Sequence, residues 1–235
     1  MIYMGRFLAL YTGGKDSHTA MLIAMKDLGM EPSLLLTIIT PRDDSYLLHT
    51  INTRWAGIHA SLMSIPIKIA KIDGHNEEDE VLKVIESSSR ETGADAIVTG
   101  GIASMYQKKR FDKIARSLGL DHIAPLWGQD QERVLKLEVL EYNVKFSIVA
   151  AMAMGLTEEW LGKMIENKED VEILIRLAKK YMFSPVGEGG EYESFVVSSP
   201  LFRCKRLIPV GKKVWFSTGW GYYEIHDIRI EKGCF

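Results

Sequence analysis

The sequence is poor in cysteine, and it contains neither a long apolar stretch nor a long run of basic residues. Cys204 and Cys234 are its two cysteines, and they do not form a C-x-x-C pair. This pattern excludes a disulfide framework and a four-ligand zinc site, and it fits a reducing cytoplasm. No apolar run reaches the roughly 18 residues of a membrane-spanning helix, and the start carries no cleavage-type segment. We therefore expect a cytoplasmic protein that does not span a membrane.

The charges nearly balance, with a formal net charge of -2 over 235 residues. Proteins that wrap nucleic acid need clustered Lys and Arg to displace counterions from phosphates, so a nucleic-acid partner is not expected. Apolar residues make up 46% and charged residues 26%, which is usual for a folded globular protein. The expected partner is a small molecule or another protein.

Apolar runs alternate with amphipathic segments over the first half of the chain. Strands are predicted at residues 6–11, 33–40, 65–72, 94–100 and 122–125, and helices at residues 17–28, 44–63, 77–92 and 103–118. This alternation is typical of right-handed βαβ units in a parallel sheet, which binds ligands at the carboxyl ends of its strands. We predict a doubly wound α/β domain with a five-stranded parallel sheet over residues 1–130.

The regular alternation ends after Trp127. A helix is predicted at residues 129–140, a strand at residues 144–153, helical segments at residues 157–182, and short β-strands that include residues 213–218 and 222–230. We predict that residues 131–235 form a smaller α+β domain.

A glycine-rich segment, T-G-G-K-D-S at residues 12–17, lies between the first predicted strand and its helix. We call it the glycine loop. Paired glycines allow a sharp turn, and the start of the helix carries partial positive charge that suits an anion. Lys15 adds a full charge that suits phosphate, whereas Asp16 indicates either a bridging magnesium ion or a helix cap. His18 follows the loop and is expected at the surface.

A second segment, G-E-G-G-E-Y-E-S at residues 187–194, places Glu188, Glu191 and Glu193 close together among glycines. We call it the acidic segment. Crowding of like charge rarely stabilises a fold, so the segment indicates a bound cation, which could be magnesium, ammonium or a quaternary ammonium group. The alternative is a solvated acidic loop.

The glycine loop resembles the S-G-G-x-D-S loop of the N-type ATP pyrophosphatases, with Thr12 in place of the first serine. A glycine loop followed by E-G-G-E-Y-E-S resembles the diphthine–ammonia ligase family. Further similarity lies in residues 44–50, in the Y-Q-x-x-R stretch that ends at Arg110, and in the P-L-W stretch that ends at Trp127. The resemblance covers residues 6–194. It departs from the family at Gly101, where relatives often carry aspartate.

The resemblance implies a HUP-like fold and an enzyme that uses ATP and magnesium to amidate diphthine, a modified histidine on translation elongation factor 2. Ammonium would be the nitrogen donor, and AMP and pyrophosphate would form through an acyl-adenylate. The implied nucleotide-binding residues are Thr12, Gly13, Gly14, Lys15, Asp16, Ser17, Thr40 and Gly100. The implied catalytic residues are Lys15, Asp16, Glu188, Glu191 and Glu193, with Asp16 also a metal ligand. The implied substrate-binding residues are Tyr46, His49, Arg110, Trp127, Gly189, Gly190 and Tyr192.

Two other functions fit the glycine loop. One is a related ATP pyrophosphatase that modifies another acceptor such as tRNA, although the chain lacks the cysteine pair that commonly carries sulfur in tRNA thiolation. The other is a sensor that binds ATP without turnover, in which the acidic segment would have no purpose. The sequence does not distinguish whether the glutamates bind ammonium or the trimethylammonium group of diphthine. It also leaves open whether the protein forms a homodimer.

Overall fold

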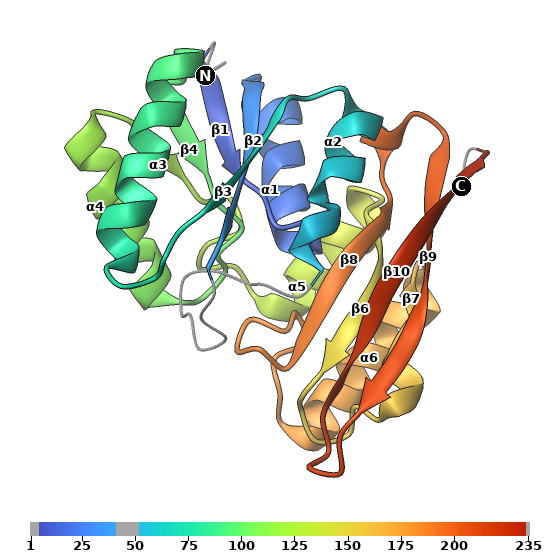
Figure 1. The fold of residues 1–235 in the computed structure, drawn as a ribbon. Helices are drawn as coiled ribbons and strands as arrows, with labels where there is room; N and C mark the ends of the chain where they lie inside the picture. Colours follow the sequence, from blue (N-terminus) through green and yellow to red (C-terminus); the bar gives the residue numbers. More distant parts are fainter. Residues whose placement is uncertain (1–4, 41–51, 234–235) are drawn as a thin grey trace. The chain divides into compact units, whose positions relative to one another are not determined.

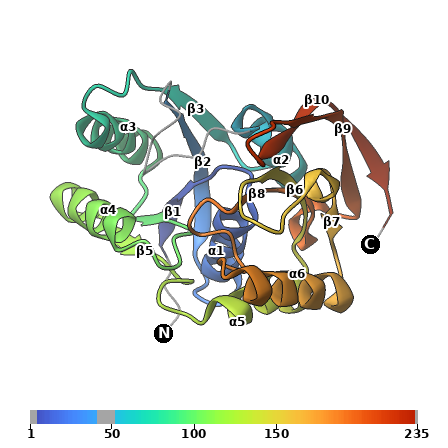
Figure 2. The same ribbon diagram turned by 90° about the horizontal axis from the view of Figure 1, so that it is seen from below.

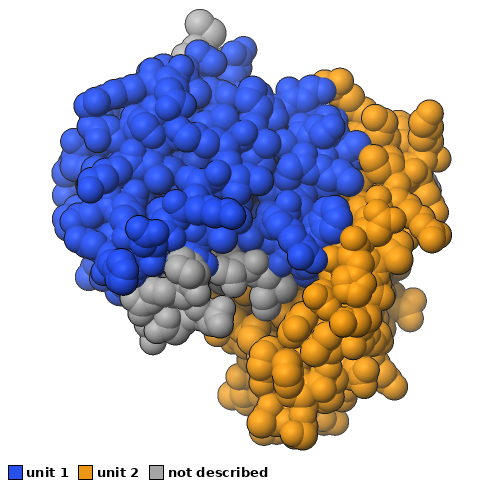
Figure 3. Space-filling model, in the orientation of Figure 1, with its two compact units in different colours: residues 1–12, 16–127 blue, residues 13–15, 128–235 orange. Residues whose placement is uncertain are grey.

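The computed structural model describes residues 5–40 and 52–233. The chain divides into two compact units, which Figure 3 shows in blue and orange. The first unit contains Met1–Thr12 and Asp16–Trp127, and the second contains Gly13–Lys15 and Gly128–Phe235. The second unit therefore includes three residues of the glycine loop, which lie far along the sequence from its other residues.

The first unit contains a five-stranded sheet in the order β3-β2-β1-β4-β5, in which every neighbouring pair is parallel. Its strands are β1 (Arg6–Leu10), β2 (Glu31–Ile39), β3 (Ile67–Lys71), β4 (Ala96–Val98) and β5 (Asp121–Ile123). The order runs outward from β1 in both directions, which is the doubly wound topology that the alternating pattern predicted. The predicted five-stranded parallel sheet is confirmed.

Helices cover both faces of this sheet. They are α1 (Lys15–Lys26), α2 (Ala56–Met63), α3 (Glu77–Thr92) and α4 (Met105–Leu118). Figure 2 shows α1 and α2 on one side of the strands and α3 and α4 on the other. On the α3 and α4 side, Leu8 and Ile97 of the sheet pack with Ile85 and Ile114 of the helices in one buried cluster. The C-terminal part of the helix predicted at residues 44–63 forms α2. Residues 44–51 lie outside the described part of the chain.

The second unit is built on a mixed-length antiparallel sheet in the order β7-β6-β10-β9, with β8 also paired to β6 (Figure 1). Its strands are β6 (Lys145–Ala151), β7 (Met164–Ile165), β8 (Tyr192–Ser198), β9 (Lys205–Trp215) and β10 (Gly221–Lys232). Its helices are α5 (Gln131–Lys136) and α6 (Lys168–Tyr181). An α+β organisation for this part of the chain was predicted from its sequence.

The predicted helical stretch at residues 157–182 is correct only for α6. Its first part forms a short 3-10 turn (Glu158–Trp160) and the strand β7. Gly162 adopts a φ of 80°, which a right-handed helix cannot contain. A new helix then starts at Asn167, whose side chain accepts hydrogen bonds from the N–H groups of Glu169 and Asp170.

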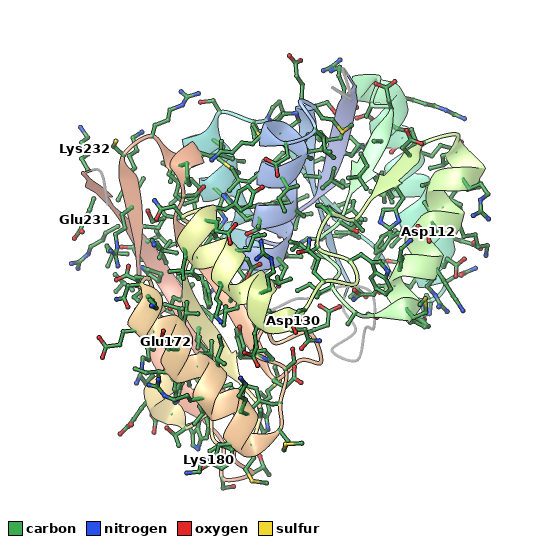
Figure 4. The ribbon with its side chains drawn as sticks, turned by 180° about the vertical axis from the view of Figure 1, so that it is seen from behind. Asp112, Asp130, Glu172, Lys180, Glu231 and Lys232 are labelled. Carbon is green, nitrogen blue, oxygen red and sulfur yellow. The ribbon has the colours of Figure 1, made fainter. Side chains whose placement is uncertain are left out.

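The helix that follows Trp127 changes its geometry along its length. Asp130, labelled in Figure 4, begins α5 by accepting a hydrogen bond from the Arg133 N–H at 2.9 Å. The helix then widens into a π-helical turn at Leu137–Glu141. Single π-helical turns of this kind are rare and occur frequently at functional sites. Glu138 in this turn has a side chain with 0% exposure.

Cys204 is disulfide-bonded, so the expectation of no disulfide is wrong for this residue. The sequence holds one further cysteine, Cys234, which lies outside the described residues. Lys205 of β9 pairs with Lys232 of β10, and the Gly233 N–H donates to the Cys204 carbonyl at 2.8 Å, which brings the two ends of the hairpin together.

Over residues 5–40 and 52–233, no helix combines the length and the apolar character needed to cross a membrane.

Two histidines of the first unit are held in surroundings that disfavour their charged form. His18 has no exposed surface, and its Nδ1 lies 2.9 Å from the Tyr11 hydroxyl. The expectation that His18 lies at the surface is therefore wrong, because α1 is buried around its circumference at residues 17–24. Burial lowers the pKa of His18 well below its usual value, and His59 lowers it further. Burial also lowers the pKa of His122, although the Asp112 carboxylate opposes this shift.

We expect the free energy of unfolding to fall as the pH drops below about 6.5, the ordinary pKa of histidine. The unfolded chain binds protons in that range that the folded His18 and His122 do not bind, so acid favours unfolding. The loss should continue down to the lowered pKa values of the folded state. Thermal unfolding followed between about pH 5 and pH 8 measures the slope, and His122→Gln should reduce it. A melting temperature that stays constant over this range would contradict the assignment.

Candidate functional site

The glycine loop is closed by its own first and last residues. The Ser17 hydroxyl oxygen lies 3.4 Å from the Thr12 N–H nitrogen and 3.3 Å from the Thr12 hydroxyl oxygen. Gly13 has a φ of 84°, which residues with a side chain rarely adopt. The loop leads directly into α1, whose first-turn N–H groups point toward it. This arrangement has the form of an anion-binding turn.

Gly100 lies against the end of the glycine loop in the first unit. A Cβ at Gly100 would stand 2.5 Å from the Ser17 nitrogen and 2.6 Å from the Asp16 carbonyl carbon. The position therefore has no room for a side chain, and the chain leaving β4 touches the start of α1. Thr40 is buried directly after β2. Because the strands are parallel, Thr40 and Gly100 lie at the same edge of the sheet as the glycine loop.

Within the second unit, Gly13–Lys15 is hydrogen-bonded to β8. The Val196 N–H donates to the Gly13 carbonyl at 2.9 Å. The Lys15 N–H donates to the Ser194 hydroxyl oxygen at 3.1 Å. Ser194 is the last residue of the acidic segment, so the two motifs singled out in the sequence are joined directly.

The Lys15 side chain enters the interior of the second unit. Its Nζ lies 3.4 Å from Glu138 Oε2, and both side chains have 0% exposure. The aromatic rings of Phe146 and Tyr192 stand with their centroids 5.9 and 5.8 Å from the same nitrogen. These rings add an attraction between a cation and aromatic faces. The ammonium group predicted to meet phosphate thus has a buried carboxylate as its neighbour.

Glu138 was not singled out from the sequence, although a signal existed. It follows Val134 and Leu135 at helical spacing, and both of these have 0% exposure. A carboxylate on the apolar face of a helix is expected to have a buried partner. The partner could not be identified because nothing in the sequence brings residue 15 near residue 138.

The acidic segment is shaped by Glu191. Its Oε1 accepts a hydrogen bond from the Ser184 N–H at 3.1 Å, and its Oε2 accepts one from the Gly189 N–H at 2.8 Å. The Glu191 carbonyl accepts hydrogen bonds from the N–H groups of Met152 and Ala153. The Glu191 side chain therefore fixes the conformation of the acidic segment through hydrogen bonds to nearby backbone N–H groups.

The other predicted residues of the acidic segment differ in exposure. Glu188 and Glu193 are half-buried, Gly189 is exposed, and Gly190 is half-buried with a φ of 82°. Tyr192 is 3% exposed, and its hydroxyl donates to the Pro185 carbonyl at 2.8 Å. Glu191 is half-buried as well, so all three carboxylates of the segment are partly exposed.

The predicted substrate-binding residues of the first unit are already in contact with neighbours. The Arg110 guanidinium lies 3.3 Å from the Tyr106 ring centroid, and its Nε lies 3.3 Å from Glu78 Oε2. Trp127 is half-buried and lines a cavity of about 20 Å³ together with Thr99 and His122. That volume is enough for one water molecule. Tyr46 and His49 lie outside the described residues.

A hydrogen-bonded chain beside this cavity was missed in the sequence. The His122 Nδ1 lies 2.6 Å from Asp112 Oδ1, and the His122 Nε2 lies 2.8 Å from the Thr99 hydroxyl. Asp112, labelled in Figure 4, also accepts a hydrogen bond from Lys108 at 2.7 Å. This chain fixes the end of β4 close to Gly100.

Over the described ranges 5–40 and 52–233, no group of three or more His, Cys, Asp or Glu side chains could hold a metal ion. Magnesium commonly takes one or two carboxylates and completes its shell with phosphate oxygens and water. Asp16 alone at the glycine loop fits that mode of binding, and its role as a metal ligand stays a prediction.

Sequence comparisons connect the chain to known proteins. The profile of the diphthamide synthase N-terminal domain matches residues 5–122, and that of the diphthamide synthase C-terminal domain matches residues 130–230. A human protein named diphthine–ammonia ligase is 30% identical over 238 residues, which cover 91% of this chain and 86% of the human protein. The Schizosaccharomyces pombe protein of that name is 30% identical over 89% of this chain, which spans 37% of that longer relative.

A solved structure from Methanocaldococcus jannaschii, described as a predicted subunit of a tRNA methyltransferase, is 16% identical with a TM-score of 0.43. The match covers 83% of this chain and 98% of that one, and a likeness at this level carries no argument about function. The two domain profiles and the human relative agree with each other over almost all of the sequence. The chain belongs to the diphthamide synthase family.

Proposed function

We propose that the chain catalyses the ATP-dependent amidation of diphthine on translation elongation factor 2, with ammonium as the nitrogen donor. The relatives' name, diphthine–ammonia ligase, supports an enzyme that forms a C–N bond. The observation that carries the proposal is a pair of hydrogen bonds between β8 and the glycine loop, in which Val196 donates to Gly13 and Lys15 donates to Ser194. Within the second unit, these bonds join Gly13–Lys15 of the proposed nucleotide-binding loop to the end of the acidic segment and to β8.

The phosphates of ATP would lie on the glycine loop. The backbone of Gly13 and Gly14 and the start of α1 supply the geometry of an anion site, and Thr12 and Ser17 supply hydroxyl groups. Asp16 would hold magnesium, which neutralises the phosphates when it is bound. Thr40 and Gly100 border the same edge of the sheet, where the rest of the nucleotide would extend.

The proposed reaction has two steps. A carboxylate oxygen of diphthine attacks the α-phosphorus of ATP, the bond from that phosphorus to the bridging oxygen breaks, and pyrophosphate leaves. Ammonia then attacks the acyl carbon, the bond from that carbon to the AMP oxygen breaks, and AMP leaves with diphthamide as the amide. Ammonium must first lose a proton, and a carboxylate can accept it as a general base.

The three glutamates of the acidic segment would divide these tasks. Both carboxylate oxygens of Glu191 already accept backbone hydrogen bonds, which favours a role in shaping the segment. We assign the binding of ammonium or of the trimethylammonium group of diphthine to Glu188 and Glu193. The remaining substrate contacts are assigned to Tyr46, His49, Arg110, Trp127, Gly189, Gly190 and Tyr192.

Product analysis tests the proposal. Purified protein with ATP, magnesium, ammonium and diphthine-bearing elongation factor 2 should release AMP and pyrophosphate in equal amounts, with amide formed on the factor. Omitting the factor should abolish sustained turnover. Formation of ADP would exclude an acyl-adenylate, and AMP release without amide would favour a different acceptor.

The cytoplasm is the proposed location because translation takes place there. A homodimer also stays a prediction, which sedimentation of the purified protein would test.

A further inference from the structure

Lys15 and Glu138 form a pair of opposite charges with no exposed surface. Each charge loses its hydration on burial, at a cost of several kcal/mol per ion in real proteins. Loss of either partner is costly, because it removes the opposite charge that offsets the burial of the other. The pair is therefore a strong constraint on where residue 15 can lie.

Glu138 is itself fixed by the backbone around it. It lies in the π-helical turn at Leu137–Glu141, and its carbonyl accepts a hydrogen bond from the Val144 N–H at 2.9 Å. The next carbonyl, that of Val139, accepts a hydrogen bond from the Lys145 ammonium at 3.1 Å. The turn is thus tied to the start of β6, and the Glu138 carboxylate has a defined position.

The main chain beside Lys15 is fixed as well. Ser194 and Val196 of β8 hold Lys15 and Gly13 through hydrogen bonds of 3.1 and 2.9 Å. Main-chain bonds and a buried side chain together attach the three residues Gly13–Lys15 to the second unit. A lysine that gripped phosphate would need its ammonium on the solvent side of the loop, and here that group faces Glu138.

We propose that Glu138 is a positioning residue that holds Lys15 as a buried anchor of the glycine loop, and that the Lys15 charge is not a phosphate ligand. The anion site then consists of loop backbone, the start of α1 and the Thr12 and Ser17 hydroxyls. This inference rests on the proposed binding of ATP to the loop. It is independent of the acceptor that is amidated.

Three variants separate an anchor from a phosphate ligand. Glu138→Gln keeps the shape of the side chain but removes the negative charge 3.4 Å from the Lys15 ammonium, and Lys15→Met removes the positive charge beside Glu138. We expect each to raise the Kd for ATP about tenfold or more, since a broken buried pair is costly. The double variant Lys15→Met with Glu138→Leu has neither charge, and its ATP affinity should return to within about threefold of the original.

Glu132→Gln is the matched control. Glu132 lies on α5 and pairs with Lys179 at 2.8 Å, but both side chains of this pair are solvent-accessible. Loss of a surface pair costs little, so ATP affinity should not change. Circular dichroism establishes that each variant is folded. A folded double variant that binds ATP as weakly as Lys15→Met would overturn the proposal.

Chemical modification of the unaltered protein tests whether Lys15 binds phosphate if the single variants do not fold. A water-soluble acetylating reagent should modify Lys179 and leave Lys15 unmodified, both with and without ATP, as read by mass spectrometry. Modification of Lys15 that ATP suppresses would show an accessible phosphate ligand and would overturn the proposal. If the original protein does not bind ATP in these experiments, the proposed function fails instead.

Discussion

Gly100→Ala should lower ATP binding and AMP formation by about 5- to 150-fold, the range that corresponds to the roughly 1–3 kcal/mol cost of overpacking. The new Cβ would meet the Ser17 nitrogen at 2.5 Å and the Asp16 carbonyl carbon at 2.6 Å. These are main-chain atoms, which cannot rotate away as the end of a long side chain can. The glycine loop or the end of β4 must therefore move, and the anion site loses its geometry. Titration with ATP and measurement of AMP release give the two quantities.

Gly101→Ala is the control for this experiment. Its Cβ would have the Gln107 Oε1 as its nearest neighbour at 3.7 Å, an ordinary contact with a flexible side chain. The two variants differ by one position and add the same methyl group. Equal losses in both would mean that the close approach of Gly100 to the loop is unimportant for ATP binding.

Glu191→Gln should lower amidation by about 100-fold while ATP binding stays within about twofold, because charge-assisted hydrogen bonds each contribute about 1.5–3 kcal/mol. The Ser184 and Gly189 N–H groups both donate to this carboxylate. An amide offers one acceptor oxygen in its place and presents an NH2 group to the other donor. The acidic segment then loses its shape, although a carboxylate remains at Glu188 and at Glu193.

Limited proteolysis distinguishes shape from chemistry in the Glu191 variant. If Glu191 shapes the segment, cleavage near residues 184–191 becomes faster as amidation falls. If Glu191 acts as the general base, amidation falls while the segment stays protected. Glu172→Gln, at the α6 position labelled in Figure 4, is the matched control, because this exposed side chain pairs only loosely with Lys168 at 3.7 Å. Unchanged amidation in Glu191→Gln would remove the residue from both roles.

The strand, loop and helix at the start of the chain could be predicted because each is specified by adjacent residues. The apolar run of β1, the paired glycines and the spacing of apolar residues in α1 are local signals. The same holds for α3, which begins at Glu77 as predicted and ends before Gly93, whose φ is 64°. Local signals also predicted a strand that ends at Gly100 and Gly101, and β4 is found there at Ala96–Val98.

Other features depend on contacts between distant residues and could not be predicted. The burial of Lys15 requires Glu138, and the hydrogen bonds to the loop come from β8. The burial of His18 follows from how α1 is packed and not from its neighbours in sequence. The stretch at residues 157–182 has helical periodicity, but Gly162 and the pairing of β7 with β6 override it. In each case tertiary packing outweighs local preference.

The assignment of Gly13–Lys15 to the second unit means that the chain passes between the units three times, after Thr12, after Lys15 and after Trp127. The N-terminal half of the chain therefore does not correspond to one structural unit, because it contains three residues of the second unit. A hybrid made by joining two relatives at residue 127 would combine the lysine of one parent with the buried carboxylate position of the other. Recombination within the family should succeed most often when this tripeptide is inherited together with the C-terminal half.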